Sequence, residues 1–351
     1  MAKRQAKKET IPEPSLEHLK RLTDDTGLFQ HAKFTIPLRS EGYTTDDNAR
    51  ALIVATKHYA LYHKPETLRL LDRYLAFVLH ASNDDGTVKN FMDFDRTWHK
   101  AEPVSDAIGR VIWAFGELLA NPPSANYIHI AQERIDIAMP LIKKQYPRGL
   151  AYSILGLAGY LKQFPYADNA KSCITNTADL IAARFEENMR PDWPWFENIL
   201  TYDNAMLPCA LFTAGITLSN KKYIELAKKI CDFVLENTFN GSHFSFVGCQ
   251  GWFPRGGKKA QFDQQPIEAA GTILMLDAGY KATKDKKYLV LRQKAFNWFL
   301  GENDLGIPVY DSKSKGCGDG LGAEGVSLNE GAESTLSFLL GLLTMQEGHI
   351  S

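Results

Sequence analysis

The sequence predicts an all-α protein, an (α/α)6 toroid in which six helical hairpins close into a barrel. Two observations lead to this prediction. Amphipathic and fully apolar helices alternate along the chain, and mostly long, polar connections lead from each amphipathic helix to the next apolar one. The helix pair recurs at roughly 45–65 residues, which is typical of a repeat architecture.

The amphipathic helices each carry one apolar stripe at steps of three and four residues. The stripe of the first clear example is Leu68, Leu71, Leu75 and Val78. Comparable stripes occur in segments 128–142, 174–185, 223–233 and 288–298, and residues 15–22 are expected to supply the leading helix. A single stripe indicates one buried face and one face in water.

The apolar helices have almost no polar face. Their segments are 49–60, 107–119, 150–161, 205–218, 267–280 and 332–343. Such helices are buried on several sides, so six of them are expected inside a ring of amphipathic ones. An α-solenoid also alternates helices, but its repeats are shorter and more uniform.

The composition narrows the class of protein. The chain has 351 residues, 44% hydrophobic and 23% charged, with a net charge of −1. It therefore lacks the basic surplus of a nucleic-acid-binding protein. No long apolar run predicts a membrane span, and no secretory signal is visible, so a cytoplasmic protein is expected. We expect a polar tail at 1–14, one barrel domain at 15–348, and five reduced cysteines.

The connections predict where the site lies. Turns from an apolar helix to the next amphipathic one are short, as at 63–65 and 219–220. Most return connections are long and contain glycine, aromatic and polar residues: 24–46, 82–105, 187–202, 237–264 and 301–329. Long loops gathered at one end of a rigid scaffold usually carry a site. A cleft is therefore expected where the apolar helices begin.

Carboxylates stand at these helix starts. Glycoside cleavage needs two carboxyl groups, and the candidates are Asp47, Asp203, Asp263 and Glu330. Asp47 and Asp263 are the favoured pair, because the first and fifth apolar helices lie nearly across the ring. Their polar neighbours are candidate substrate ligands: Asp46, Asn48, Gln264 and Gln265. Acidic residues also cap helices, so a purely structural role stays open for each.

Four tryptophans fall in the same connections: Trp98, Trp193, Trp195 and Trp252. Sugar rings pack on indole, and sugar hydroxyls bond to carboxylates such as Glu197, so a neutral-sugar site is predicted. Loop tryptophans also serve as core residues, and that alternative stays open. Arg255 and Asp319 lie in glycine-rich segments, which are expected to form rims that approach a ligand.

Five strings resemble a known family: 42–50, 200–208, 251–257, 262–270 and 329–335. Together they resemble a bacterial and archaeal helical domain that accompanies glycosyltransferases and belongs to the six-hairpin glycosidase superfamily. The resemblance covers roughly 16–345. It implies hydrolysis or phosphorolysis of a glycosidic bond, commonly with inversion, and some relatives are epimerases or lyases. No glycosyltransferase portion stands beside the helical domain in this sequence.

The leading hypothesis is a glycoside hydrolase that acts on short neutral oligosaccharides by an inverting two-carboxylate mechanism. The alternatives are a glycan-binding or scaffold module that partners a glycosyltransferase or a glycoside phosphorylase, a phosphorylase, and an epimerase. An epimerase is disfavoured because no histidine falls in the first turn of an apolar helix. No metal or cofactor is predicted, because no histidine stands at metal-ligand spacing.

Overall fold

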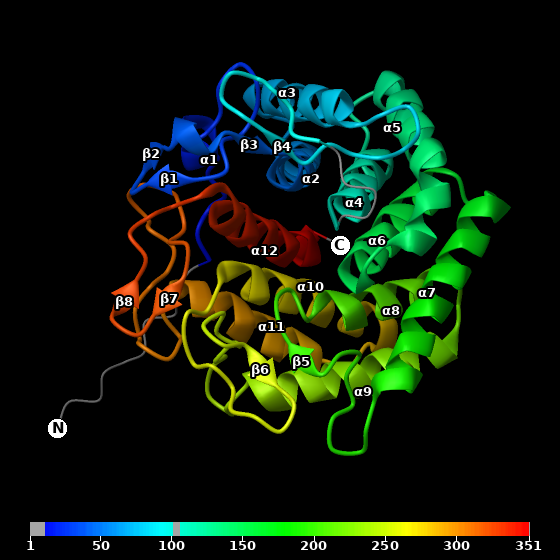
Figure 1. The fold of residues 1–351 in the computed structure, drawn as a ribbon, viewed down its shortest axis with the longest axis vertical. Coiled ribbons are helices and arrows are strands. Elements are labelled where there is room, and N and C mark those ends of the chain that lie inside the picture. The colour runs from blue at the N-terminus through cyan, green and yellow to red at the C-terminus, as the bar shows by residue number, and fades with distance from the viewer. Residues whose placement is uncertain (1–10, 101–105, 351) are drawn as a thin grey trace.

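The computed structural model describes residues 11–100 and 106–350, and side chains as far as residue 347. Within these residues, twelve α-helices form an inner and an outer ring (Figure 1). The inner helices are α2 (Thr45–Tyr62), α4 (Asp106–Ala120), α6 (Pro147–Gln163), α8 (Met206–Thr217), α10 (Pro266–Thr283) and α12 (Ala332–Ile350). They pack in cyclic order, and α12 contacts α2 to close the ring. The predicted (α/α)6 toroid is confirmed.

The outer ring carries the amphipathic helices. These are α1 (Glu17–Arg21), α3 (Pro65–Ala81), α5 (Ala125–Ala138), α7 (Asp168–Asn188), α9 (Lys221–Thr238) and α11 (Lys287–Asn297). Each of α3 to α11 packs on the inner helix that precedes it, and α1 packs on α12. Three 3-10 helices complete the helical part: η1 (Arg39–Glu41), η2 (Met139–Lys144) and η3 (Trp298–Leu300). At five residues, α1 is shorter than the sequence predicts.

The described strands form four two-stranded antiparallel ribbons and no central sheet. They are β1 (Ala32–Lys33) with β2 (Ile36–Pro37), β3 (Tyr43–Thr44) with β4 (Phe91–Met92), β5 (Ile199–Leu200) with β6 (Phe253–Pro254), and β7 (Leu321–Gly322) with β8 (Gly325–Val326). The β3–β4 and β5–β6 ribbons each join loops that lead to different inner helices. These ribbons tie neighbouring connections together at the end where the inner helices begin.

Local sequence sets the helix boundaries. The Thr44 hydroxyl caps α2 by accepting the Asp47 N–H at 3.1 Å, and α2 ends at His63 in the left-handed conformation. Pro65, Pro147 and Pro266 stand in the first turns of α3, α6 and α10, where a missing N–H costs nothing.

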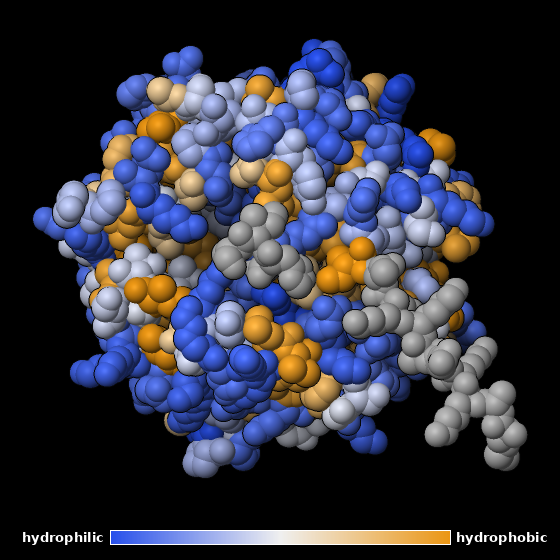
Figure 2. All heavy atoms as spheres, turned by 180° about the vertical axis from the view of Figure 1, so that it is seen from behind, coloured by the Kyte–Doolittle hydropathy of each residue, from blue (hydrophilic) through white to orange (hydrophobic). Residues whose placement is uncertain are grey.

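Figure 2 shows the molecule from the side opposite to Figure 1. Hydrophilic side chains dominate this face, and the hydrophobic ones form separate patches. No helix in the described part of the chain is both long and apolar enough to cross a membrane. Most of the predicted tail, residues 1–10, lies outside the described residues.

Glycines bring α4 and α6 into direct backbone contact. A Cβ added to Gly116 would overlap the carbonyl oxygen of Gly156, and one added to Gly109 would overlap that of Gly149. These are backbone atoms, which cannot move aside as a flexible side chain can. Close approach of the two helices therefore depends on residues without a side chain.

Gly116→Ala tests this dependence. The methyl group would force α4 away from α6, so we expect the free energy of unfolding to fall by about 2 kcal/mol or more. Urea denaturation followed by circular dichroism measures the change. Gly341→Ala in α12 is the control, because its one close contact is the flexible end of Ile273 at 2.9 Å, and the rings of Phe299 and Phe296 lie at ordinary contact distance. A shift within about 1 kcal/mol is expected there. Equal shifts in both variants would contradict the argument.

Candidate active site

A cleft of about 360 Å³ lies where the inner helices begin, as the loop pattern predicts. Its polar and aromatic lining comes from α2, α4, α10, α12 and three connecting loops. These residues are Asp46, Arg50, Asn90, Asp106, Arg110, Tyr202, Trp252, Gln265 and Glu333. A concave site with converging polar groups is the usual form of a small-ligand site.

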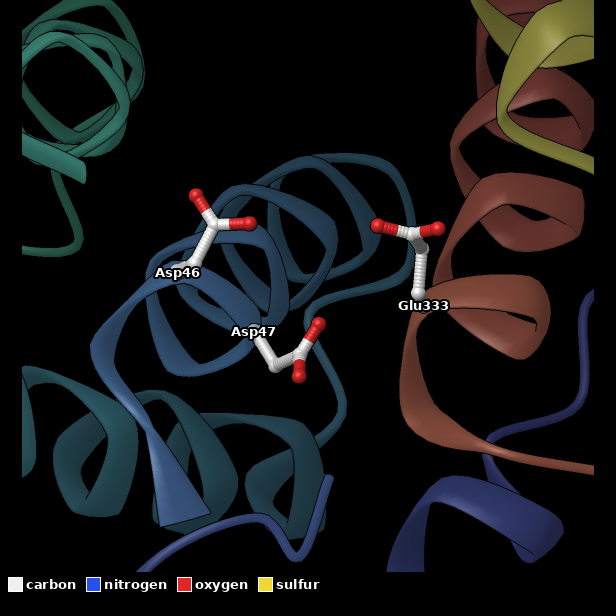
Figure 3. Close-up of side chains that lie close together, drawn as sticks. All are labelled: Asp46, Asp47 and Glu333. Atoms are coloured by element: carbon white, nitrogen blue, oxygen red, sulfur yellow. The ribbon is translucent and has the colours of Figure 1, made fainter. Parts of the chain in front are cut away.

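Three carboxylates meet at one side of this cleft (Figure 3). Asp46 and Asp47 project from the first turn of α2, and Glu333 faces them from α12. One oxygen of each lies within 4.8 Å of the others, a spacing that could hold a metal ion. The buried Arg50 guanidinium already bonds all three: Nη2 lies 2.8 Å from Asp46 and 2.9 Å from Glu333, and Nη1 lies 2.9 Å from Asp47. Its positive charge offsets part of the negative charge of the cluster.

The two neighbouring aspartates have opposite electrostatic environments. Burial alone would raise the pKa of Asp46, but the Arg110 and Arg50 guanidinium groups outweigh it and hold this pKa below its usual value. Burial raises the pKa of Asp47 to about 6, against the opposing effect of Arg50. Near pH 6, one carboxyl group is therefore ionised while the other still holds a proton in about half of the molecules.

A second polar network lies deeper along the barrel axis. The Tyr152 hydroxyl accepts a hydrogen bond from Arg110 Nη2 at 2.8 Å and donates one to Asp203. Glu268 accepts the Asp203 backbone N–H and a bond from Asn204. Burial is the main cause that raises the pKa of Glu268 to about 8, and repulsion from Asp203 is the second cause. Burial also raises the pKa of Asp203. Glu268 below the cleft therefore holds its proton near neutral pH.

Arg148 holds the loop that precedes α8. Its guanidinium pairs with Glu197 and donates to the Tyr202 carbonyl oxygen and the Thr201 hydroxyl, both at 3.1 Å. The Tyr202 hydroxyl in turn donates to Asp106 at the start of α4. Glu197 is thus an anchor for this loop, and Tyr202 is the residue that the loop presents to the cleft.

The predicted site residues are only partly brought together. Three line the cleft: Asp46, Trp252 and Gln265. Asp47 lies beside it in the Arg50 cluster, and Asp203 lies below it on the barrel axis. These residues come from different inner-helix starts, which supports the predicted location of the site.

Three of the four predicted tryptophans lie elsewhere. Trp195 is fully buried and Trp193 is nearly so, and both pack against Phe233. Trp98 packs on Phe77 and donates from its indole N–H to His80. Trp252 alone of the four lines the cleft. This placement corrects the prediction of a four-tryptophan sugar platform: Trp193 and Trp195 belong to the core, and Trp98 is partly buried against Phe77.

Asp263 does not face Asp47 across the cleft. Its carboxylate lies against Gly320, and the adjacent Gln264 forms a bridge with Leu321, so this segment turns toward the 316–321 loop. Burial raises the pKa of Asp263, as was expected for at least one member of the favoured pair. Glu330 also lies outside the described cleft lining. Its carboxylate accepts a hydrogen bond from the Ser314 hydroxyl.

The remaining predicted ligands make structural contacts. Asn48 donates to the Thr44 carbonyl oxygen at 2.8 Å, and Gln264 accepts the Phe246 N–H at 3.0 Å. Asp319 accepts the Gly331 N–H at 2.7 Å, and Arg255 pairs with Asp192 at 3.2 Å near the surface. All of these polar groups stabilise loops or helix starts.

Sequence reasoning missed three cleft and floor residues that share one signal: Arg50, Arg110 and Tyr152. Each stands four residues after a polar residue at a helix start, namely Asp46, Asp106 and Arg148. Positions i and i+4 lie on the same helix face. A buried charge requires a partner, so a charged residue inside an otherwise apolar helix indicates a polar centre.

No family model and no curated protein matches the chain. Solved structures do match over nearly the full length. A sugar epimerase from a ruminal bacterium has 11% identity and a TM-score of 0.71, covering 93% of this chain and 94% of its own. Cellobiose 2-epimerase from Spirochaeta thermophila has 9% identity, a TM-score of 0.69 and coverages of 94% and 93%. A GH76 α-mannanase from Bacteroides thetaiotaomicron has 11% identity and a TM-score of 0.67, covering 95% of this chain and 94% of its own.

This chain shares the (α/α)6 toroid fold with these neighbours. Identities near 10% establish the fold and no activity. The narrower resemblance to the glycosyltransferase-associated family stays a prediction.

The raised pKa of Glu268 predicts that stability falls as the pH rises. The folded protein keeps this proton up to about pH 8, whereas the ordinary value for glutamate is 4.5. Between these values the folded state binds more protons, so unfolding becomes easier with rising pH. Glu268→Gln removes this titration. Urea unfolding at pH values from about 5 to about 8.5 measures the effect. Over this range the free energy of unfolding of Glu268→Gln should decrease by about 1 kcal/mol or more less than that of the wild type.

Glu225→Gln on the exposed face of α9 is the matched control and should keep the wild-type slope. The same slope in Glu268→Gln and the wild type would mean that Glu268 is ionised throughout.

Proposed function

We propose that the protein is a glycoside hydrolase that acts on short neutral oligosaccharides, with Asp46 and Asp47 as its two catalytic carboxyl groups. The observation that carries this proposal is the opposite shift of two neighbouring pKa values at the cleft: Asp46 lies below its usual value, and Asp47 lies at about 6. Carboxyl groups whose environments separate their pKa values can divide the acid and base roles between them.

The spacing of the carboxylates supports a retaining mechanism. One oxygen of Asp46 and one of Asp47 lie no more than 4.8 Å apart, which places the two groups below the separation of about 6.5–9.5 Å that inverting enzymes need for a water. The proposal therefore replaces the inverting mechanism expected from the sequence.

In the first step, Asp47 donates its proton to the leaving oxygen as the C–O bond breaks, and Asp46 bonds to the anomeric carbon. In the second step, the Asp47 carboxylate takes a proton from water, whose oxygen displaces Asp46. The two steps together consume one water and restore both side chains.

The rest of the cleft suits an uncharged sugar. Trp252 and Tyr202 offer aromatic surface, and Asn90, Gln265 and Asp106 offer hydrogen-bonding groups for hydroxyls. Both arginines of the described lining already pair with carboxylates. They are therefore occupied, which argues against an acidic sugar. A mannanase among the structural neighbours agrees with this substrate class.

A glycan-binding module is the second candidate. Arg50 holds the carboxylates of Asp46 and Glu333 in fixed positions, where they could accept hydrogen bonds from sugar hydroxyls without any cleavage. An oligosaccharide panel with and without phosphate separates the outcomes. Shortened products indicate hydrolysis, a sugar phosphate indicates phosphorolysis, and an isomer of unchanged length indicates the epimerase activity named for two neighbours. Binding without any product favours the module.

Asp46→Asn and Asp47→Asn test the assignment. Each change keeps the size of the side chain but removes a nucleophile or an acid, so turnover should fall at least about a hundredfold. Steady-state release of reducing ends measures it, and circular dichroism checks the fold. Asp263→Asn is the control, because Asp263 lies outside the described cleft lining, and it should stay within about threefold of the wild type. A large loss in both Asp47→Asn and Asp263→Asn, with normal turnover in Asp46→Asn, would restore the pair favoured by the sequence.

The pH profile gives a separate test. Asp47 must be protonated to act as an acid, so kcat/KM should fall as the pH rises through about 6. The Thr44 hydroxyl donates to Asp47 at 2.7 Å and stabilises its ionised form. Thr44→Val should therefore move this alkaline limb to higher pH, and Thr44→Ser should leave it in place. An identical limb in all three proteins would exclude Asp47 as the acid.

A further inference from the structure

A second pocket lies at the opposite end of the barrel, where the inner helices end. Its volume is about 480 Å³, compared with about 360 Å³ for the cleft. Within the described parts of the chain, the two linings share no residue. The second pocket is therefore a separate feature of the fold, and the proposed hydrolase mechanism makes no use of it.

The interior of this far-end pocket is apolar and already shaped. Its walls include Trp113, Leu155, Ile216 and Leu274, each from a different inner helix. The ring of Trp113 is held in place because it stacks on Tyr152 with the centroids 5.9 Å apart and the planes 13° apart. Small residues such as Ala158 and Gly159 leave the space between these walls open. A preformed apolar pocket of this size can enclose a small organic molecule.

The charged residues of the lining are mostly basic. They are Lys57, Lys162, Lys171, Lys281, Glu117 and Asp277. Glu117 lies 3.4 Å from Lys57, and Asp277 lies 2.7 Å from Lys281. Lys171 lies 3.8 Å from Asp168, an exposed carboxylate outside the lining, and the described part of the chain shows no ion pair for Lys162. The pocket thus combines an apolar interior with lysine ammonium groups at its edge.

We propose that the far-end pocket is a second binding site, for a small organic anion that carries an aromatic or short acyl body. The apolar walls take the body, and Lys162 and Lys171 attract the carboxylate, sulfonate or phosphate group. The concave apolar interior and the lysines at its edge complement such a molecule. The site is independent of the cleft, so the proposal does not require that the protein cleaves glycans.

Fluorescent probes test the proposal on the full chain without any glycan. Anilinonaphthalene sulfonate has an aromatic body with one negative charge, and phenylnaphthylamine is its uncharged counterpart. The double variant Lys162→Glu and Lys171→Glu should weaken binding of the sulfonate at least about tenfold, because two attractive charges become repulsive. It should change binding of the neutral probe by less than about threefold. Ala158→Phe should weaken binding of both probes, because its ring fills the pocket.

The matched control is Lys143→Glu with Lys144→Glu, the same charge reversal on two exposed lysines of η2. It should bind both probes like the wild type. Thermal unfolding establishes that each variant is folded. Absence of stoichiometric sulfonate binding to the wild type would overturn the proposal. So would equal affinity in the wild type, the Lys162/Lys171 variant and Ala158→Phe, because the probe would then lie on another surface. Catalytic failure in the cleft would change neither result.

Discussion

Arg50 lies where the first and last inner helices meet, and its guanidinium bonds carboxylates from both. Asp46 and Asp47 belong to α2, and Glu333 belongs to α12. The closure of the ring and the assembly of the cleft are therefore parts of one interaction. Without this charge, three carboxylates would remain within 4.8 Å of one another with far less compensation. Loss of one partner from a buried ion pair typically costs about 3–5 kcal/mol.

The direction of the inner helices gives the two ends of the barrel opposite electrostatic characters. Helix N-termini carry partial positive charge, and the cleft end gathers acidic first-turn residues such as Asp46, Asp106 and Glu333. Helix C-termini carry partial negative charge, and Lys162 and Lys281 stand in the last turns at the other end. The helix polarity itself disfavours an anion at that end, so anion binding there depends on the lysine side chains.

The sequence predicted the rings and the cleft end because both follow from local patterns. A helix with one apolar stripe joins the outer ring, and a helix that is apolar on all sides joins the inner ring. The length of the loops indicates which end of the barrel carries the cleft. The tryptophans could not be predicted in this way. Whether Trp195 or Trp252 faces solvent depends on how an irregular loop folds onto α9 or over the cleft. Arg50 and Arg110 were missed because they lie inside helices that otherwise indicated only packing.

Helix geometry explains how two consecutive residues acquire different roles. Successive side chains in an α-helix point about 100° apart, so Asp46 and Asp47 meet different surroundings from the same turn. Asp46 is 24% exposed and pairs with Arg110 and Arg50, whereas Asp47 is 9% exposed and pairs with Arg50 alone. The more exposed group gains two opposite charges and stays ionised. The more buried one gains a single charge that does not offset its loss of water, and it keeps its proton to higher pH.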